Sequence, residues 1–300
     1  MQIETVIPLL QPVNDELLKP YGVNLFVLRT DLNHPHISGN KLYKMKYNLL
    51  EAKKQNKKTI LTFGGAFSNH IAATAAAGKE YGFKTIGLIR GEEYPQLNPT
   101  LLFASECGMQ LQYVSRTLFR NKAELNKYAT ETFPEENIYF IPEGGSNELG
   151  VIGCKEITPH IPINFDYICC ACGTGATISG ITFSLKENQK AIGFQILKAE
   201  NYIQSEVEKW FEYFDLPLTA NWHIDENYHF GKYGKINPAL SNFINHFEKE
   251  NIIPLDYVYT GKMMFGIYDL IKKGFFKKGQ IIIAIHTGGL QGNAGFLSKI

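Results

Sequence analysis

The chain alternates short apolar runs with longer segments in which apolar residues recur every three or four positions. The short runs predict strands at 59–63, 84–89, 110–114, 137–141, 166–170, 192–197 and 280–285. The segment 255–262 is predicted to pass from extended to helical, with Met264, Ile267 and Ile271 on the apolar face of the helix. The periodic segments predict helices at 69–79, 100–106, 122–132 and 204–214, with further helices starting at 147 and 177. Such repetition is the pattern of an α/β fold, in which helices cover both faces of an open parallel sheet.

Glycine-containing loops follow four of the predicted strands, at 64–70, 143–147, 173–177 and 286–289. In open parallel sheets, ligands bind where loops leave the carboxyl ends of the strands. We therefore expect the chemistry of the protein in these loops.

The loop Gly173-Thr174-Gly175-Ala176-Thr177 lies between a predicted strand and a predicted helix. Its two glycines allow the backbone to wrap around an anion, and its threonines supply hydroxyl donors beside the start of the helix. No Gly-Lys-Ser/Thr follows, so the loop is not a P-loop, and it lacks the third glycine of the dinucleotide fingerprint. It predicts a site for a cofactor with a single phosphate.

Ser68, Asn69 and His70 stand where another loop enters an alanine-rich helix. A helix cap formed by Ser68 or Asn69 is the simplest interpretation. The same backbone N–H groups, together with a hydroxyl and an amide, can also hold a carboxylate or a phenolate. His70 is a candidate for moving a proton, although a capping or packing histidine is commoner.

Lys41 lies between a small polar turn and a predicted helix whose apolar residues are Leu42, Met45 and Leu49. A lysine at a helix start is near backbone N–H groups and positive dipole, which disfavours its ammonium form and favours a nucleophilic amine. The alternative is a solvated lysine, because several lysines follow between 44 and 58.

Composition narrows the class of partner. Lys and Arg number 30 against 29 Asp and Glu, a formal charge of +1, so nothing favours nucleic acid or an anionic membrane. No apolar run approaches the ~20 residues of a membrane-spanning helix, and the first residues do not resemble an export signal. We expect a small-molecule partner and a cytoplasmic location.

The five cysteines, an odd number, do not form the pattern of a disulfide framework. Cys169, Cys170 and Cys172 end an apolar run and lack a second pair of ligands at zinc-site spacing. We interpret them as buried small hydrophobic residues and expect no metal.

Gly-Asn-Lys41, Ser68-Asn-His70, the loop at 173–177 and His286-Thr-Gly-Gly289 occur together in one order that resembles the fold-type II pyridoxal-phosphate enzymes. Within these, the set is most similar to the 1-aminocyclopropane-1-carboxylate deaminase and D-cysteine desulfhydrase family. The resemblance implies two open, mostly parallel-sheet domains with pyridoxal 5′-phosphate in the cleft between them. The larger would comprise 1–44 plus 144–300 and the smaller 45–143. We expect an amino-acid substrate and a homodimer.

By this resemblance, Lys41 binds the cofactor covalently and moves the substrate α-proton, and Asn69 bonds the cofactor phenolic oxygen. Catalytic roles are implied for Lys41, Ser68, Tyr233 and Tyr259. The resemblance also implies that the cofactor phosphate is bound by Gly173, Thr174, Gly175, Ala176 and Thr177. It implies that Thr260 faces the pyridine nitrogen. The implied substrate contacts are Phe67, Ser68, Asn69, His70 and Thr287.

Thr260 and Thr287 bear on the reaction. A carboxylate facing the ring nitrogen would keep it protonated and give the strong electron sink that opening of a cyclopropane ring demands. Threonine leaves a weaker sink, which favours β-elimination. The deaminases of the family have Glu and Leu at these positions and the desulfhydrases have hydroxyl residues, so this chain resembles the second group.

The sequence therefore predicts α,β-elimination from a small D-amino acid, D-cysteine first, to pyruvate, ammonia and sulfide. The alternatives are a 1-aminocyclopropane-1-carboxylate deaminase and a non-catalytic binding protein. Two departures from the family pattern, Tyr43 in place of arginine and Phe67 in place of glutamine, predict a more apolar pocket mouth.

Overall fold

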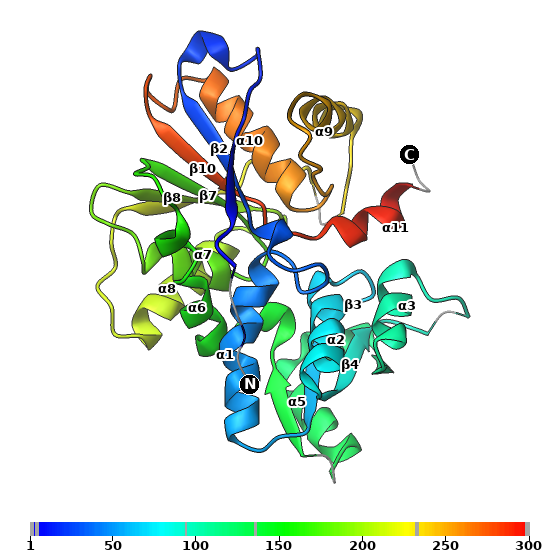
Figure 1. Ribbon diagram of the computed structural model, residues 1–300. Coiled ribbons are helices and arrows are strands. Elements are labelled where there is room, and N and C mark those ends of the chain that lie inside the picture. Colours follow the sequence, from blue (N-terminus) through cyan, green and yellow to red (C-terminus); the bar gives the residue numbers. More distant parts are fainter. Residues whose placement is uncertain (1–2, 4–5, 94, 135–136, 232–233, 298–300) are drawn as a thin grey trace.

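The computed structural model describes residues 3, 6–93, 95–134, 137–231 and 234–297. Its strands form two separate sheets. In Figure 1 the larger sheet lies in the upper half with α9 and α10, and the smaller sheet lies in the lower half with α2, α3 and α5. The predicted α/β fold with mostly parallel sheets is confirmed.

The larger sheet has six strands in the order β1-β2-β10-β7-β8-β9. β1 is antiparallel to β2, and the other neighbours are parallel. The strands are β1 Leu9–Pro12, β2 Asn24–Arg29, β7 Tyr167–Cys172, β8 Lys190–Gln195, β9 Trp222–Asp225 and β10 Ile281–Ile285. One face is covered by α9 Pro238–Asn251 and α10 Thr260–Lys272, the other by α6 Glu148–Cys154, α7 Ala176–Thr182 and α8 Tyr202–Tyr213.

The smaller sheet has four parallel strands in the order β5-β4-β3-β6. The strands are β3 Thr59–Gly65, β4 Lys84–Arg90, β5 Met109–Val114 and β6 Ile138–Ile141. One face packs on α1 Asn40–Lys54, α2 Asn69–Tyr81 and α3 Pro99–Glu106, the other on α4 Arg116–Arg120 and α5 Lys122–Thr132. The chain also forms α11 Ala294–Leu297 and short 3-10 helices at Lys19–Tyr21, Thr30–Leu32, Glu143–Gly145, Thr158–His160 and Leu290–Asn293.

Strand β7 is buried on both faces, which explains its continuous apolar run. Cys169 packs toward α9 and α10, whereas Cys170 and Cys172 face the opposite helices, because successive side chains of a strand point to opposite faces. All three thiols are free and buried. The interpretation of this cluster as core residues is confirmed.

The structure contains four elements that the sequence did not predict: β1, β2, β9 and α9. β1 and β9 are four residues long and half-exposed, so they carry little periodicity. The segment 255–262, predicted to pass from extended to helical, does enter a helix, α10, at Thr260, but residues 257–259 just before it form a turn. In that turn the Asp256 carboxylate accepts hydrogen bonds from the backbone N–H groups of Val258 and Tyr259, which bends the chain into α10.

The division into domains of 1–44 plus 144–300 and 45–143 stays a prediction. The strands of the smaller sheet all fall between 59 and 141, and those of the larger sheet fall on either side.

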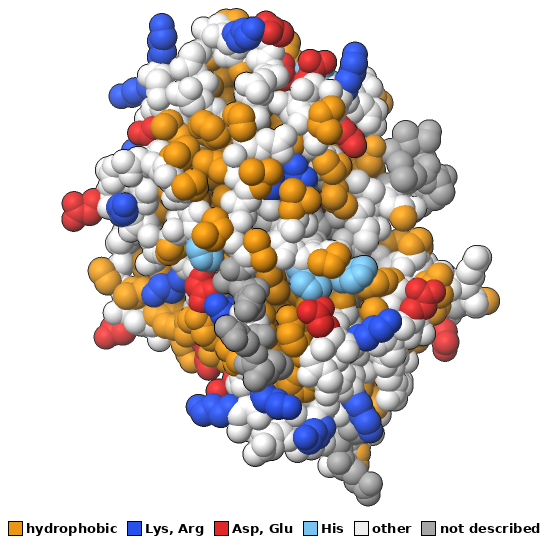
Figure 2. Space-filling model, viewed as in Figure 1, with side chains coloured by type: hydrophobic (Ala, Val, Ile, Leu, Met, Phe, Trp, Pro, Cys, Tyr) orange, Lys and Arg blue, Asp and Glu red, His pale blue; other side chains and the backbone are white. Residues whose placement is uncertain are grey.

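Basic and acidic side chains are interspersed over the face shown in Figure 2, as expected from the nearly balanced composition. Among the described residues, no helix combines the length and apolar character that crossing a membrane requires.

Candidate active site

A cavity of about 430 Å³ lies where loops from the two sheets meet. The loops that follow β3, β6, β7, β8 and β10 all contribute to it, as expected for the carboxyl ends of parallel strands. The predicted site residues that line it are Lys41, Phe67, Ser68, Asn69, His70, Gly173, Thr174, Gly175, Thr177, Tyr259 and Thr287. The tertiary structure thus brings together loops that are far apart in the sequence.

Lys41 is the second residue of α1, and the tightly packed Gly39 is the N-cap of that helix. A Cβ on Gly39 would lie 2.0 Å from the carbonyl oxygen of Thr287, so only glycine allows the two turns to approach this closely. Lys41 Nζ donates a 2.7 Å hydrogen bond to Asn40 Oδ1, and Asn40 Nδ2 donates to Thr177 Oγ1 at 2.8 Å. The helix start, the Thr287 turn and the loop after β7 therefore position this amine together.

The pKa of Lys41 is lowered from 10.5 to about 7, first by burial and then by the nearby charge of Lys44. The sequence argument rested on the helix start, whereas the larger physical cause is desolvation of the ammonium. At neutral pH a large fraction of Lys41 is the free amine, the form that can act as a nucleophile or take up a proton.

The reactivity of Lys41 toward an amine reagent is expected to rise through about pH 7 in the cofactor-free protein, because its amine form becomes dominant there. Labelling with acetic anhydride at graded pH, read at Lys41 by mass spectrometry, measures the midpoint. A free lysine peptide labelled in parallel gives the reference, about 10.4. Lys44→Met removes the like charge and is expected to move the Lys41 midpoint upward. A wild-type midpoint close to the peptide value would contradict the lowered pKa.

The loop after β7 fits a phosphate group. Gly173 and Gly175 keep the backbone open: a Cβ on Gly173 would come 3.3 Å from the Tyr259 ring, and Gly175 has a φ of 80°. Thr174 and Thr177 place hydroxyl groups at the cavity. Ala176 begins α7 and is fully buried, so a contact with the cofactor by its side chain is not what the cavity lining indicates.

Lys44 is a cation of the cavity that the sequence argument did not single out. Its ammonium is buried and donates to the carbonyl oxygen of Gly144 at 2.8 Å, and burial lowers its pKa. Residues three apart on a helix share a face, so its spacing from Lys41 was the available signal. The buried ammonium of Lys44 and the two threonine hydroxyls suit the dianionic phosphate of pyridoxal phosphate.

Ser68 caps α2, since its hydroxyl accepts from the backbone N–H of Ile71, as the simple interpretation predicted. Asn69 lines the cavity, and its Oδ1 accepts from Gln291 Nε2 at 2.9 Å. Phe67 is 41% exposed at the cavity and lies against the C-terminal segment, where a Cβ on Gly295 would come 2.6 Å from its ring. This loop therefore contacts the C-terminal segment as well as the cavity.

The tautomer of His70 follows from its hydrogen bonds. Thr62 Oγ1 donates its hydrogen to the carbonyl oxygen of Ile141, so it accepts from His70 Nε2 at 2.9 Å. The other ring nitrogen, Nδ1, is buried and has no partner among the described residues. Burial, and then the charges of Lys41 and Lys44, hold the pKa of His70 well below its ordinary value. His70 therefore offers an acceptor lone pair at Nδ1.

Thr62→Val is expected to lower the free energy of unfolding by about 1–3 kcal/mol, because His70 Nε2 and the Ile141 carbonyl lose their partner. It is also expected to reduce turnover roughly tenfold by releasing the His70 ring from its orientation. Thr62→Ser retains the hydroxyl and should restore both quantities, which are measured by urea denaturation and steady-state kinetics. Equal effects of Val and Ser would show that the hydroxyl does not position His70.

Four other predicted residues have different outcomes. Tyr259 and Thr287 line the cavity. Thr260 is fully buried, and its hydroxyl donates to Asp256 Oδ1 at 2.7 Å. It is not among the described residues that line the cavity, so its role opposite the ring nitrogen stays a prediction. Tyr233 lies outside the described residues.

The expectation that Tyr43 makes the pocket mouth apolar is wrong. Its side chain is fully buried in the core of the larger sheet with Cys154 and Ile157. The cause is helix geometry: Tyr43 follows Lys41 by two positions and so points away from the cavity.

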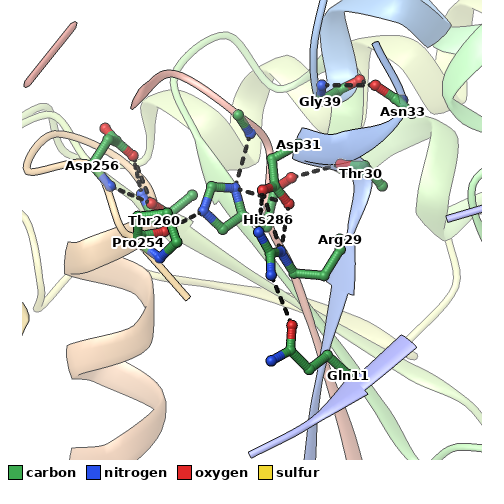
Figure 3. A network of polar contacts seen from close by, with 11 residues as sticks. Gln11, Arg29, Thr30, Asp31, Asn33, Gly39, Pro254, Asp256, Thr260 and His286 are labelled. Atoms are coloured by element: carbon green, nitrogen blue, oxygen red, sulfur yellow. Dashed lines mark hydrogen bonds and ion pairs between the residues drawn. The ribbon is translucent and has the colours of Figure 1, made fainter. Parts of the chain in front are cut away.

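A buried polar network lies behind the Lys41 and Thr287 turns (Figure 3). Arg29 donates three hydrogen bonds to Asp31, from Nε to Oδ1 at 2.9 Å and to Oδ2 at 3.2 Å, and from Nη2 to Oδ2 at 2.7 Å. Its Nη1 donates to Gln11. Thr30, between Arg29 and Asp31 in the sequence, connects this network to the site. Its hydroxyl donates to the His286 carbonyl oxygen at 2.6 Å, and its carbonyl oxygen accepts from the backbone N–H of Gly39. The sequence gives no signal for this arrangement, which joins residues more than 250 positions apart.

Comparison with known proteins gives a consistent picture. A family described as "Pyridoxal-phosphate dependent enzyme" matches residues 6–288. A Pyrococcus furiosus protein named "Putative 1-aminocyclopropane-1-carboxylate deaminase" is 32% identical over 305 residues, which cover 94% of this chain and 89% of that protein.

An Arabidopsis thaliana protein named "Bifunctional D-cysteine desulfhydrase/1-aminocyclopropane-1-carboxylate deaminase, mitochondrial" is 29% identical, with 91% of this chain and 74% of that protein covered. A solved structure described as an "ACC deaminase homologue" matches with a TM-score of 0.86 and 26% identity, over 100% of this chain and 94% of that one. With a cavity whose lysines, hydroxyls and glycines fit the cofactor, this chain belongs to the pyridoxal-phosphate-dependent enzymes, in the family of 1-aminocyclopropane-1-carboxylate deaminases and D-cysteine desulfhydrases.

Proposed function

We propose that this enzyme catalyses α,β-elimination from a small D-amino acid, with D-cysteine as the first candidate, yielding pyruvate, ammonia and hydrogen sulfide. The observation that carries the proposal is the charge of the cavity. Among the described lining residues, Glu143 alone bears a carboxylate, and it is paired with Lys122 at 2.7 Å. The carboxylate beside Thr260, that of Asp256, already accepts bonds from the start of α10. Neither is free to hold a ring nitrogen protonated.

When the α-carbon of the substrate loses its proton, it retains an electron pair. Pyridoxal phosphate, when bound, delocalises that pair. A weak sink suits a substrate whose β-substituent itself departs with an electron pair, as the sulfur of cysteine does. A cyclopropane substrate has no such leaving group, so opening its ring requires a cofactor that withdraws electrons more strongly.

The residues of the chain divide the remaining tasks. Lys44, Thr174 and Thr177 would hold the phosphate of the bound cofactor, and Asn69 would bond its phenolic oxygen. Lys41, whose pKa is about 7, is the base that removes the α-proton. Ser68 and the first N–H groups of α2 bind the substrate carboxylate, and Tyr259, Tyr233 and Thr287 complete the substrate side. Phe67 favours a small substrate with an uncharged side chain.

The test is a steady-state assay of pyruvate release from the D- and L-forms of cysteine, serine and β-chloroalanine, with release of 2-oxobutanoate from 1-aminocyclopropane-1-carboxylate measured in parallel. We expect the largest kcat/KM for D-cysteine. Faster ring opening than D-cysteine breakdown would reject the elimination reaction. A response to L-substrates alone would reject the stereochemistry.

The second candidate is 1-aminocyclopropane-1-carboxylate deamination. The names of the Pyrococcus and Arabidopsis relatives favour it, since both include that activity. The threonines at 260 and 287 are the reason for ranking it second.

We also propose a cytoplasmic homodimer. The cysteines at 154, 169, 170 and 172 are free and buried, which suits a reducing compartment. Light scattering of the purified holoenzyme gives the mass, and a value close to the 33.9 kDa of one chain would reject the dimer.

A further inference from the structure

A second cavity, of about 950 Å³, is more than twice the volume of the one that holds Lys41. It lies at the carboxyl edge of the smaller sheet, where loops leave β3, β4 and β5. Gly65, Ala66, Phe67 and Arg90 form a wall that it shares with the active site. We call it the outer cavity. Its position at the ends of parallel strands is where α/β sheets bind ligands.

The outer cavity is cationic. Arg90, Arg116 and Arg120 line it, against the single carboxylate of Glu92. Within the part of the chain that the structure describes, none of the three arginines has an ion pair or a side-chain hydrogen bond. Each guanidinium carries five N–H donors arranged for carboxylate or phosphate oxygens. Three positive charges from the arginines and one negative charge from Glu92 leave a net charge of +2 in the cavity, which suits a dianion.

The wall of this cavity is held in place by its own hydrogen bonds. Asn98 Oδ1 accepts from the backbone N–H groups of Thr100 and Leu101, while its Nδ2 donates to the Ala66 carbonyl at 3.0 Å. Arg90 lies over the Phe119 ring, with Cζ 5.4 Å from the ring centre. Burial raises the pKa of Tyr113, so its hydroxyl stays protonated and can donate. The wall formed by Asn98, Ala66 and Arg90 is therefore ordered before a ligand binds, which limits the entropy that this part of the site loses on binding.

We propose that the outer cavity is a second ligand site, which binds a small dianion such as a dicarboxylate or a phosphate monoester. It is separate from the phosphate loop at Gly173, which does not line it. Because Ala66 and Phe67 belong to both cavities, the bound anion contacts the loop that carries Ser68 and Asn69. The proposed elimination reaction is not needed for this binding.

Isothermal titration calorimetry of the holoenzyme with succinate and with methyl phosphate tests the site, and the two probes distinguish a carboxylate ligand from a phosphate ligand. Arg116→Gln/Arg120→Gln removes two exposed guanidinium groups of the cavity. Lys53→Gln/Lys127→Gln removes two exposed ammonium groups elsewhere and is the charge-matched control. Circular dichroism and Tm of both variants verify folding.

We expect saturable binding of at least one probe, weakened tenfold or more by the arginine pair and less than twofold by the lysine pair. Arg90 is left unchanged because it also lines the active site. Three results would overturn the proposal: no saturation by either probe up to about 10 mM, unchanged affinity in the arginine variant, or equal weakening in both variants. Since binding is read without turnover, failure of the proposed reaction would leave this test intact.

Discussion

Lys41→Ala is expected to lower the rate of pyruvate formation by at least about 10³-fold, because it removes the amine that we propose both anchors the cofactor and takes the α-proton. The absorption band of the bound cofactor near the visible edge should be lost or shifted. Lys41→Arg makes the test sharper, since a guanidinium keeps the positive charge but is never deprotonated. It should be as inactive as the alanine variant, because the reaction needs the free amine that burial and Lys44 favour at Lys41.

The control for this experiment is Lys53→Ala, on the exposed face of the same helix, which should retain activity. If Lys41→Ala keeps both the absorption band and turnover, Lys41 is not the cofactor lysine. An active Lys41→Arg would show that charge, and not the free amine, is what matters at this position.

Asp31→Leu is expected to reduce the free energy of unfolding by about 3–5 kcal/mol, since it leaves the buried Arg29 guanidinium without its counter-charge. The side chains of Arg29 and Asp31 are only 8% and 2% exposed, so solvent cannot replace the lost partner. The substitution is also expected to loosen the site. The neighbouring Thr30 accepts a hydrogen bond from the backbone N–H of Gly39, two residues before Lys41, and donates one to the carbonyl oxygen of His286, directly before Thr287.

Urea denaturation followed by circular dichroism measures the change. Arg29→Met/Asp31→Leu removes both charges and should recover more than half of the loss, because a buried ion pair can often be replaced by apolar residues. Glu131→Leu breaks the exposed pair with Lys127, whose side chains are 66% and 73% exposed, and should cost less than about 1 kcal/mol. A loss no larger in Asp31→Leu than in Glu131→Leu would mean that the Arg29–Asp31 pair is not needed for stability.

The sequence determined much of the fold, because periodicity records which face of each segment is buried. The strands β3, β4, β7 and β10 are buried over most of their length and mostly apolar, and they were predictable within one or two residues. β1 and β9 were not, since short, half-exposed strands are defined by hydrogen bonds to a neighbouring strand and not by their own pattern.

For the site, the sequence by itself determined the glycine loops after strands, the helix-start lysine and the family, all of which depend on residues close together in the chain. Tertiary structure decided what depends on distant neighbours. Burial and Lys44 lower the pKa of Lys41 to about 7, and Thr62 sets the tautomer of His70. Asp256 accepts the hydrogen bond of the Thr260 hydroxyl. Tyr43 turned out to be buried in the core, and the arginines of the outer cavity were brought to one edge from two separate segments. Desolvation and hydrogen-bond partners arise only when the chain is folded, so no local pattern could have predicted them.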